Sequence, residues 1–135
     1  MIEFAMKPFL CFVMMTVCSV SWADWEYTDS TDSFILYHDK STIRRNGAFV
    51  QMWNLKDYFV VQTDVSTPFK SEKSLWKHNC KDETTALVSL NHFSESVGKG
   101  RVILTHTITE QKLEWNPVVP GTIGETDWKI ACGKK

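Results

Sequence analysis

The chain has 135 residues, of which 15 are lysine or arginine and 16 are aspartate or glutamate, so its formal net charge at pH 7 is −1. This near balance argues against a general nucleic-acid binder, because such proteins carry a clear excess of positive charge. The length suits a single domain with a modest hydrophobic core.

The first 23 residues have the features of a signal peptide, so we expect the mature domain to span residues 24–135. Lys7 supplies a positive start, residues 9–20 are apolar, and residues 21–23 (Ser-Trp-Ala) form a small-x-small cleavage site. The apolar run is too short for a transmembrane helix. Cys18 raises the alternative of a lipid anchor, but a valine precedes it where a lipobox requires a small residue. We therefore expect a periplasmic, secreted or cell-surface protein.

Two cysteines remain in the predicted mature chain, Cys80 and Cys132. An exported chain with two cysteines most simply forms one disulfide. The bridge would close a loop of about 50 residues and stabilise the fold by roughly 4 kcal/mol in the chain-entropy description. The alternative is a pair of buried thiols.

The body of the chain alternates between β-rich segments and turns. Composition and period-two alternation predict strands near residues 25–28, 33–38, 48–55, 58–62, 74–80, 84–94 and 101–109. The dipeptide Asn46-Gly47 is a strong hairpin signal between two of them. Consecutive short strands followed by one helix predict an antiparallel α+β domain.

The helix is predicted in the stretch 114–133, EWNPVVPGTIGETDWKIACG. Thr122 and Glu125 have the spacing of a capping box, which predicts a helix over residues 123–132 with Thr122 as its N-cap. Gly133 stands where a left-handed residue would end it. Asp127 projects near the middle of the apolar arc. We therefore expect Asp127 to be paired with a strand lysine or arginine, or to lie at the rim.

Three histidines, His78, His92 and His106, lie on predicted strands in register with apolar residues. If these strands adjoin, the imidazoles could converge on a metal or a haem iron. The alternative, which we favour, is that they are packed or edge histidines, so we predict no metal site and no cofactor. We also predict no enzyme, because no phosphate loop, zinc motif or nucleophile–base pair stands out.

A basic strip surrounds one tryptophan just before and after Cys80. Its members are Lys70, Lys73, Trp76, Lys77 and Lys81. The strip could bind an acidic partner surface, and the alternative is an ordinary solvated strand face. Strand parity places Trp76 and His78 on the same face as Cys80, which should look at the helix, and Lys77 on the other face.

The stretch 114–133 closely resembles the ending of the surface-adhesin protein E family. Residues 39–58, DKSTIRRNGAFVQMWNLKDY, resemble the same family, with Ser-Thr-Ile-Arg before an Asn-Gly turn. The resemblance implies a sheet of about six antiparallel strands with the C-terminal helix on its concave face, tied by a Cys80–Cys132 disulfide. It also implies outer-surface proteins that bind host matrix glycoproteins such as vitronectin and laminin and can form homodimers. Haem binding is associated with the type member.

Two functions follow as expectations. The first is an exported, non-enzymatic binding module that binds a host extracellular-matrix glycoprotein through the basic strip. The second is a periplasmic accessory protein that holds a small ligand or haem between helix and sheet. The missing lipobox favours the second, and fold alone does not decide function.

Overall fold

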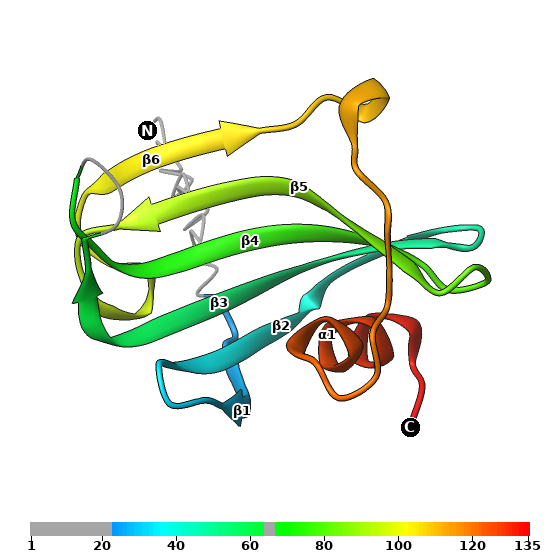
Figure 1. Ribbon diagram of the computed structural model, residues 1–135, viewed down its shortest axis with the longest axis horizontal. Helices are drawn as coiled ribbons and strands as arrows, with labels where there is room; N and C mark the ends of the chain where they lie inside the picture. The colour runs from blue at the N-terminus through cyan, green and yellow to red at the C-terminus, as the bar shows by residue number, and fades with distance from the viewer. Residues whose placement is uncertain (1–22, 64–66) are drawn as a thin grey trace, which may run out of the picture.

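The structure is a computed structural model, and it describes residues 23–63 and 67–135. Six antiparallel strands lie side by side in chain order (Figure 1). They are β1 Glu26–Ser30, β2 Phe34–Asn46, β3 Phe49–Gln62, β4 Phe69–Asn79, β5 Thr84–Phe93 and β6 Val102–Thr107. A two-residue strand, β7 (Asn116–Pro117), pairs with the start of β5. The predicted antiparallel sheet of about six strands is confirmed, whereas the predicted signal peptide lies outside the described residues except for Ala23.

The predicted Asn-Gly hairpin joins β2 to β3. Gly47 has a positive φ of 62°, and Asn46 pairs directly with Phe49 across the turn. Such a two-residue loop needs the left-handed backbone that glycine adopts without strain. The hairpin is therefore confirmed, and it places the two arginines before Asn46 at one end of the sheet.

β3 is longer than either strand predicted in this region, because residues 48–55 and 58–62 join into one element. Two charged residues, Lys56 and Asp57, lie between the two predicted strands. In the structure they lie in the sheet, where Lys56 approaches Glu72 at 4.0 Å and Asp57 approaches Lys70 at 3.7 Å. These cross-strand ion pairs allow charged residues to remain inside a central strand.

The helix α1 spans Ile123–Cys132, as the capping pattern predicts. The Thr122 hydroxyl oxygen accepts a hydrogen bond from the Glu125 backbone N–H at 3.3 Å. Gly133 ends the helix in the left-handed conformation, with φ 67° and ψ 33°. The Glu125 carboxylate reaches the N–H of Gly121 at 3.5 Å, one residue before the cap, so the capping box is slightly extended.

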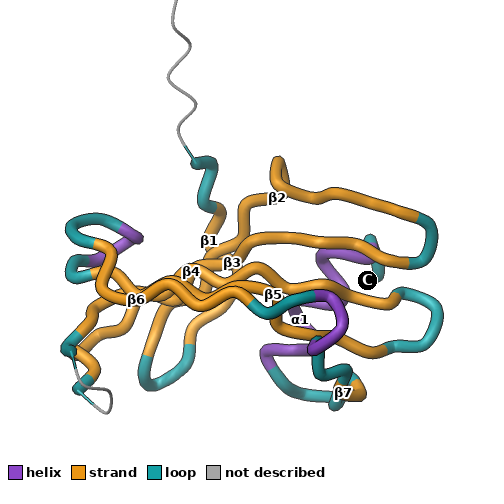
Figure 2. The backbone as a smooth tube through the Cα atoms, turned by 90° about the horizontal axis from the view of Figure 1, so that it is seen from above, coloured by secondary structure: helices purple, strands orange, loops and turns teal. Residues whose placement is uncertain are grey.

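α1 lies against one face of the sheet, here called the helix face, and the chain that leads into β1 lies on the other side, here called the far face (Figure 2). Ala131 packs on the buried Val50 and Met52 of β3. The disulfide joins Cys80 to Cys132 with a Cα–Cα distance of 5.7 Å, which confirms the predicted pair. No helix in the described part of the chain is long and apolar enough to cross a membrane.

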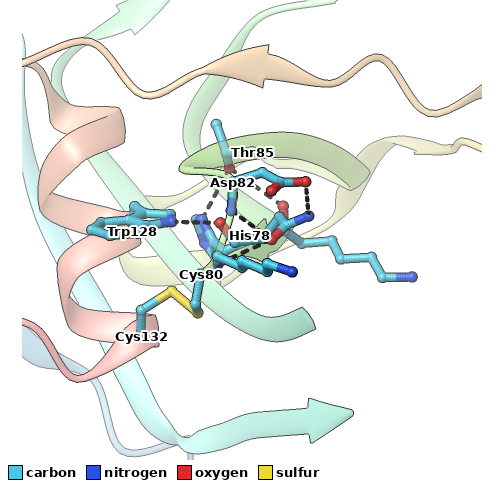
Figure 3. Close-up of a disulfide and its surroundings, with 9 residues drawn as sticks. His78, Cys80, Asp82, Thr85, Trp128 and Cys132 are labelled. Carbon is cyan, nitrogen blue, oxygen red and sulfur yellow. Dashed lines mark hydrogen bonds between the residues drawn. A yellow bond between two sulfur atoms is a disulfide. The ribbon is translucent and has the colours of Figure 1, made fainter. Parts of the chain in front are cut away.

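The helix has a further polar attachment beside the disulfide (Figure 3). The Trp128 indole N–H donates to the backbone oxygen of Asn79 at 3.0 Å. Because Asn79 directly precedes Cys80, the disulfide and this hydrogen bond fix the second half of α1 to the end of β4. A ten-residue helix is marginal alone in water, so these attachments and its packing hold it.

Candidate functional site

A buried polar cluster lies under α1 and is centred on Asp127, which is only 4% exposed. Its carboxylate contacts His38 Nε2 at 2.5 Å and accepts a hydrogen bond from Asn54 Nδ2 at 2.9 Å. His38 on β2 and Asn54 on β3 are directly paired in the sheet, which brings both side chains to the same place on the helix face. The expectation that Asp127 is paired is correct, but its expected partner was wrong, since neither a lysine nor an arginine is involved.

The cluster continues to the edge of the sheet through the second nitrogen of His38. Thr28 Oγ1 on β1 lies 2.7 Å from His38 Nδ1. Hydroxyl, imidazole and carboxylate thus follow one another in the order used by nucleophilic hydrolases. His38, however, has 0% of its surface exposed, so a substrate has no access to its ring. We assign the chain Thr28–His38–Asp127 a structural role, which ties β1, β2 and α1 together.

His78 is a second buried histidine on the helix face. It lies near the end of β4, two residues before Cys80. Its Nδ1 lies 3.0 Å from Thr85 Oγ1, while its Nε2 has no hydrogen-bond partner within the described residues. Burial lowers the pKa of His78 to about 4, although the nearby Asp127 carboxylate opposes this shift. The ring is therefore neutral at neutral pH.

A small recess opens between α1 and the sheet, here called the helix–sheet pocket, with a volume of about 230 Å³. It is lined by Asn54, Lys56, Trp76, Thr85, Ile123, Gly124 and Asp127. Asn54 is 1% exposed, and its Oδ1 has no partner in the part of the chain that the structure describes. The volume lies below the usual range of about 300–1,000 Å³ for drug-sized ligands. At this volume, and with no imidazole among its lining residues, the pocket does not fit a haem group.

The structure does not bring the three predicted histidines together. His92 is bonded to Glu72 at 3.1 Å, and Glu72 stands six residues before His78 on β4, which corresponds to about 20 Å. His106 lies on β6 and is exposed. No group of three metal-ligating side chains is found among residues 23–63 and 67–135.

The basic strip is divided between different surroundings. Trp76 lies on the helix face, where it lines the helix–sheet pocket. Lys70 donates hydrogen bonds to the backbone oxygen of Tyr58 and to Ser96 Oγ. Lys81 is exposed in the turn after β4. Strand alternation separates Trp76 from the lysines that flank it in sequence.

Lys77 lies on the far face, as strand parity predicted, and Lys73 lies there too, but both have internal neighbours. Lys73 Nζ lies over the rings of Trp25 and Phe93 at 5.7 and 4.9 Å, and burial lowers the pKa of Lys73. Lys77 Nζ forms an ion pair with Glu110 at 2.7 Å. The structure therefore leaves little of these two ammonium groups available to a partner.

A different basic surface lies beside Lys77 at the hairpin end of the sheet. Here a recess of about 190 Å³, the hairpin recess, is lined by Arg44, Arg45, Asn46, Phe49, Gln51 and Lys77. Both arginines are exposed, and the exposed rings of Phe49 and Trp115 are 5.6 Å apart. Sequence reasoning missed the arginines, although two adjacent cations just before an Asn-Gly turn are a recognisable signal of a charged hairpin tip.

Comparison with known proteins agrees with this architecture. The family model for surface-adhesin protein E matches residues 25–133. Crystal form II of Haemophilus influenzae protein E aligns with a TM-score of 0.57 at 18% identity, over 78% of this chain and 91% of that one. The selenomethionine form of the same protein gives 0.56 at 18%, over 78% and 90%. These two likenesses show the fold. A search of curated proteins returns no match. Because the family model spans nearly the whole domain, the chain belongs to the surface-adhesin protein E family.

Proposed function

We propose that this protein is an exported adhesive module that binds an acidic segment of a host matrix glycoprotein through its hairpin recess. The observation that carries the proposal is the grouping of Arg44, Arg45 and Lys77 around one recess, next to the exposed rings of Phe49 and Trp115. Family membership supports export or surface exposure and an adhesive role.

Arg44 and Arg45 are the residues of this recess whose charge a partner could contact. They are exposed, whereas the Lys77 side chain is 16% exposed and paired with Glu110. Arginine suits such a role because its planar guanidinium can bind a carboxylate or sulfate with two parallel hydrogen bonds. Phe49 and Trp115 add apolar contact area, as aromatic residues do in the centres of interfaces.

Part of the basic strip belongs to the same surface. Phe49 pairs with Asn79 at the end of β4, and the turn that follows carries the exposed Lys81. Lys81 therefore remains in the proposed partner-binding surface, whereas Lys77 lines the recess with an ammonium group that is already paired with Glu110. Lys70, Lys73 and Trp76 are assigned to other contacts.

The test is a charge reversal with a matched control. Arg44→Glu combined with Arg45→Glu changes the net charge by −4 at the hairpin end of the sheet. Lys99→Glu combined with Arg101→Glu makes the same change with exposed residues at the opposite end (Figure 1). We expect only the first pair to abolish binding to immobilised vitronectin or laminin. Equal binding by both double variants would remove the hairpin recess from the proposal.

A homodimer is part of the family expectation, and the outer edge of β6 supports it. β6 is last in the strand order, and Val102 and Leu104 on it are 58% and 42% exposed. A strand edge without charged residues can pair with the same strand of a second copy. Light scattering should give the mass of a dimer, and Leu104→Lys should shift it to a monomer. A monomeric wild type refutes this part.

A second candidate function is small-ligand binding in the helix–sheet pocket. Asn54 Oδ1, which has no hydrogen-bond partner among residues 23–63 and 67–135, and the Asp127 carboxylate favour a ligand with N–H donors, such as a small amine or an amino acid. A ligand of this kind raises the melting temperature by mass action. We expect Trp76→Ala to remove the shift and Trp115→Ala to retain it. The absence of any shift with a panel of amines and amino acids refutes this candidate.

A further inference from the structure

The chain enters the fold beside a buried carboxylate. The backbone N–H of Asp24 donates to Asp39 Oδ2 at 3.1 Å, and Asp39 is 3% exposed. The other oxygen, Oδ1, accepts hydrogen bonds from the backbone N–H, at 3.0 Å, and the hydroxyl of Ser41. Within residues 23–63 and 67–135, no lysine, arginine or histidine forms an ion pair with this carboxylate. The Asp39 carboxylate is thus hydrogen-bonded but has no cationic partner among these residues.

A buried carboxylate without a counter-charge is costly, because desolvation disfavours the ionised form. The atom that faces Asp39 is the nitrogen of the residue directly after the predicted cleavage site. Hydrolysis of the Ala23–Asp24 bond consumes one water molecule, leaves a carboxylate on Ala23 and converts this amide nitrogen into an α-amino group. With an ordinary pKa of about 7.7–8.0, that group is largely a protonated ammonium at pH 7.

We propose that the Ala23–Asp24 bond is the processing site of the chain, and that the α-ammonium group released on Asp24 binds the buried Asp39 carboxylate. Two independent observations meet at this bond: the small residues at positions 21 and 23, and the contact between Asp24 and Asp39. Cleavage by an endopeptidase that selects small side chains at these positions supplies the counter-charge that the folded domain lacks. The proposal goes beyond adhesion, since it concerns how the domain is matured.

A mature chain that began at Cys18 would make a different contact with Asp39. A lipid anchor at Cys18 would leave six residues before Asp24 and keep its nitrogen a neutral amide with one hydrogen. The other charged group lining this part of the far face is Lys73 of β4, which lies against Trp25 and Phe93. Asp24 adds its own exposed carboxylate. The new ammonium would therefore be the cation closest to Asp39.

The first test is the mass of the exported protein. The full chain is produced with its own leader in a Gram-negative host, and the intact mass of the product is measured. We expect the mass of residues 24–135 with one disulfide. A lipidated product beginning at Cys18, or any start other than Asp24, overturns the proposal.

The second test measures the ion pair itself. The domain is released from a fusion so that it begins at Asp24, and it is compared with the same domain acetylated on the α-amino group. We expect the free amine to give the higher urea midpoint at pH 6.5, and we expect Asp39→Asn to remove the difference. Asp32→Asn, the same change at an exposed turn residue, should retain it. Equal midpoints for the free and acetylated wild type overturn the ion pair.

A measurement on the wild type alone covers the case in which Asp39→Asn does not fold. An NMR titration of the ¹⁵N-labelled Asp24 α-amino group should give a pKa above that of the same group in the urea-unfolded chain, because the carboxylate favours the ammonium. An equal or lower pKa in the folded protein contradicts the proposal.

Discussion

At the scale of single residues, the position of α1 depends on the hydrogen bonds of Asp127. The helical pattern predicts that Asp127 faces the sheet, since it falls within the apolar arc. Its partners, His38 and Asn54, are 89 and 73 residues away and become neighbours only through the β2–β3 register. The helical spacing shows that a buried aspartate at position 127 needs a partner. It does not show which residue that is, because the partner is set by the pairing of distant strands.

Replacing Asp127 should destabilise the whole domain. Asp127→Asn removes the negative charge and replaces one acceptor oxygen with an NH₂ donor, so either His38 or Asn54 loses its buried acceptor, which should cost about 2–4 kcal/mol. Urea unfolding measures the loss, and Asp32→Asn, an identical change in an exposed turn, is the control. A loss of under about 0.5 kcal/mol, typical of surface changes, would show that the cluster does not hold the helix.

Acid should weaken the fold through His78. Its pKa is about 4 in the folded protein, because of burial, against 6.5 for an ordinary histidine. Between these values the unfolded chain binds a proton that the folded chain does not, so stability falls as the pH drops from about 6.5 to about 4. One pKa unit corresponds to about 1.4 kcal/mol, so the loss should approach roughly 3 kcal/mol.

The check is the urea midpoint at pH 7 and at pH 4.5 for the wild type and two variants. His78→Gln should flatten the pH dependence, whereas His106→Gln, at an exposed histidine, should leave it unchanged. If His78→Gln keeps the full pH dependence, another group is responsible.

At the scale of elements, α1 is the part that the sequence predicts best. The information is local: a cap residue, a glutamate three residues later and a terminal glycine, all within the twelve residues 122–133. The strands were predicted less well at their ends, since β3 continues through Lys56 and Asp57, which fall between two predicted strands. Those charges are satisfied by Glu72 and Lys70 on β4, and only the sheet pairing reveals this.

The cap itself can be tested by one substitution. Thr122→Ala removes the side-chain acceptor of the Glu125 N–H and should cost about 1 kcal/mol. Thr109→Ala is a matched control, because Thr109 also precedes a helical turn, η2 (Glu110–Lys112), but its side chain makes no capping bond within the described residues. Equal urea midpoints for the two variants would mean that the Thr122 cap contributes nothing.

The disulfide should contribute more to the free energy of unfolding than the Thr122 cap does. Cys132→Ser opens a loop with a sequence separation of 52 residues and should destabilise the domain by roughly 2–5 kcal/mol. Proteolysis of the variant should begin in α1, since the helix is then held by its packing and by the hydrogen bonds of Trp128 and Asp127, without a covalent tie. The finding of two free thiols in the exported protein, labelled under denaturing and non-reducing conditions, would contradict the bridge.

At the scale of the whole molecule, the sequence predicts the architecture but not the surface that we propose to be adhesive. The strip of lysines around Trp76 is continuous in sequence, yet a strand turns neighbouring side chains to opposite faces. Trp76 therefore lines the helix–sheet pocket while Lys77 faces Glu110. The hairpin recess combines residues from β2, β3 and β4, and such a surface emerges only once the sheet is assembled.

The measurement that tests the adhesive function most directly is the equilibrium binding of the wild-type domain to immobilised vitronectin and laminin across a salt series. We predict saturable binding that weakens steadily as salt is raised, because exposed charge contacts are screened over about 8 Å at physiological ionic strength. Saturable binding that does not respond to salt would contradict recognition by the hairpin arginines. The absence of saturable binding to either glycoprotein would contradict the adhesive function proposed for this chain.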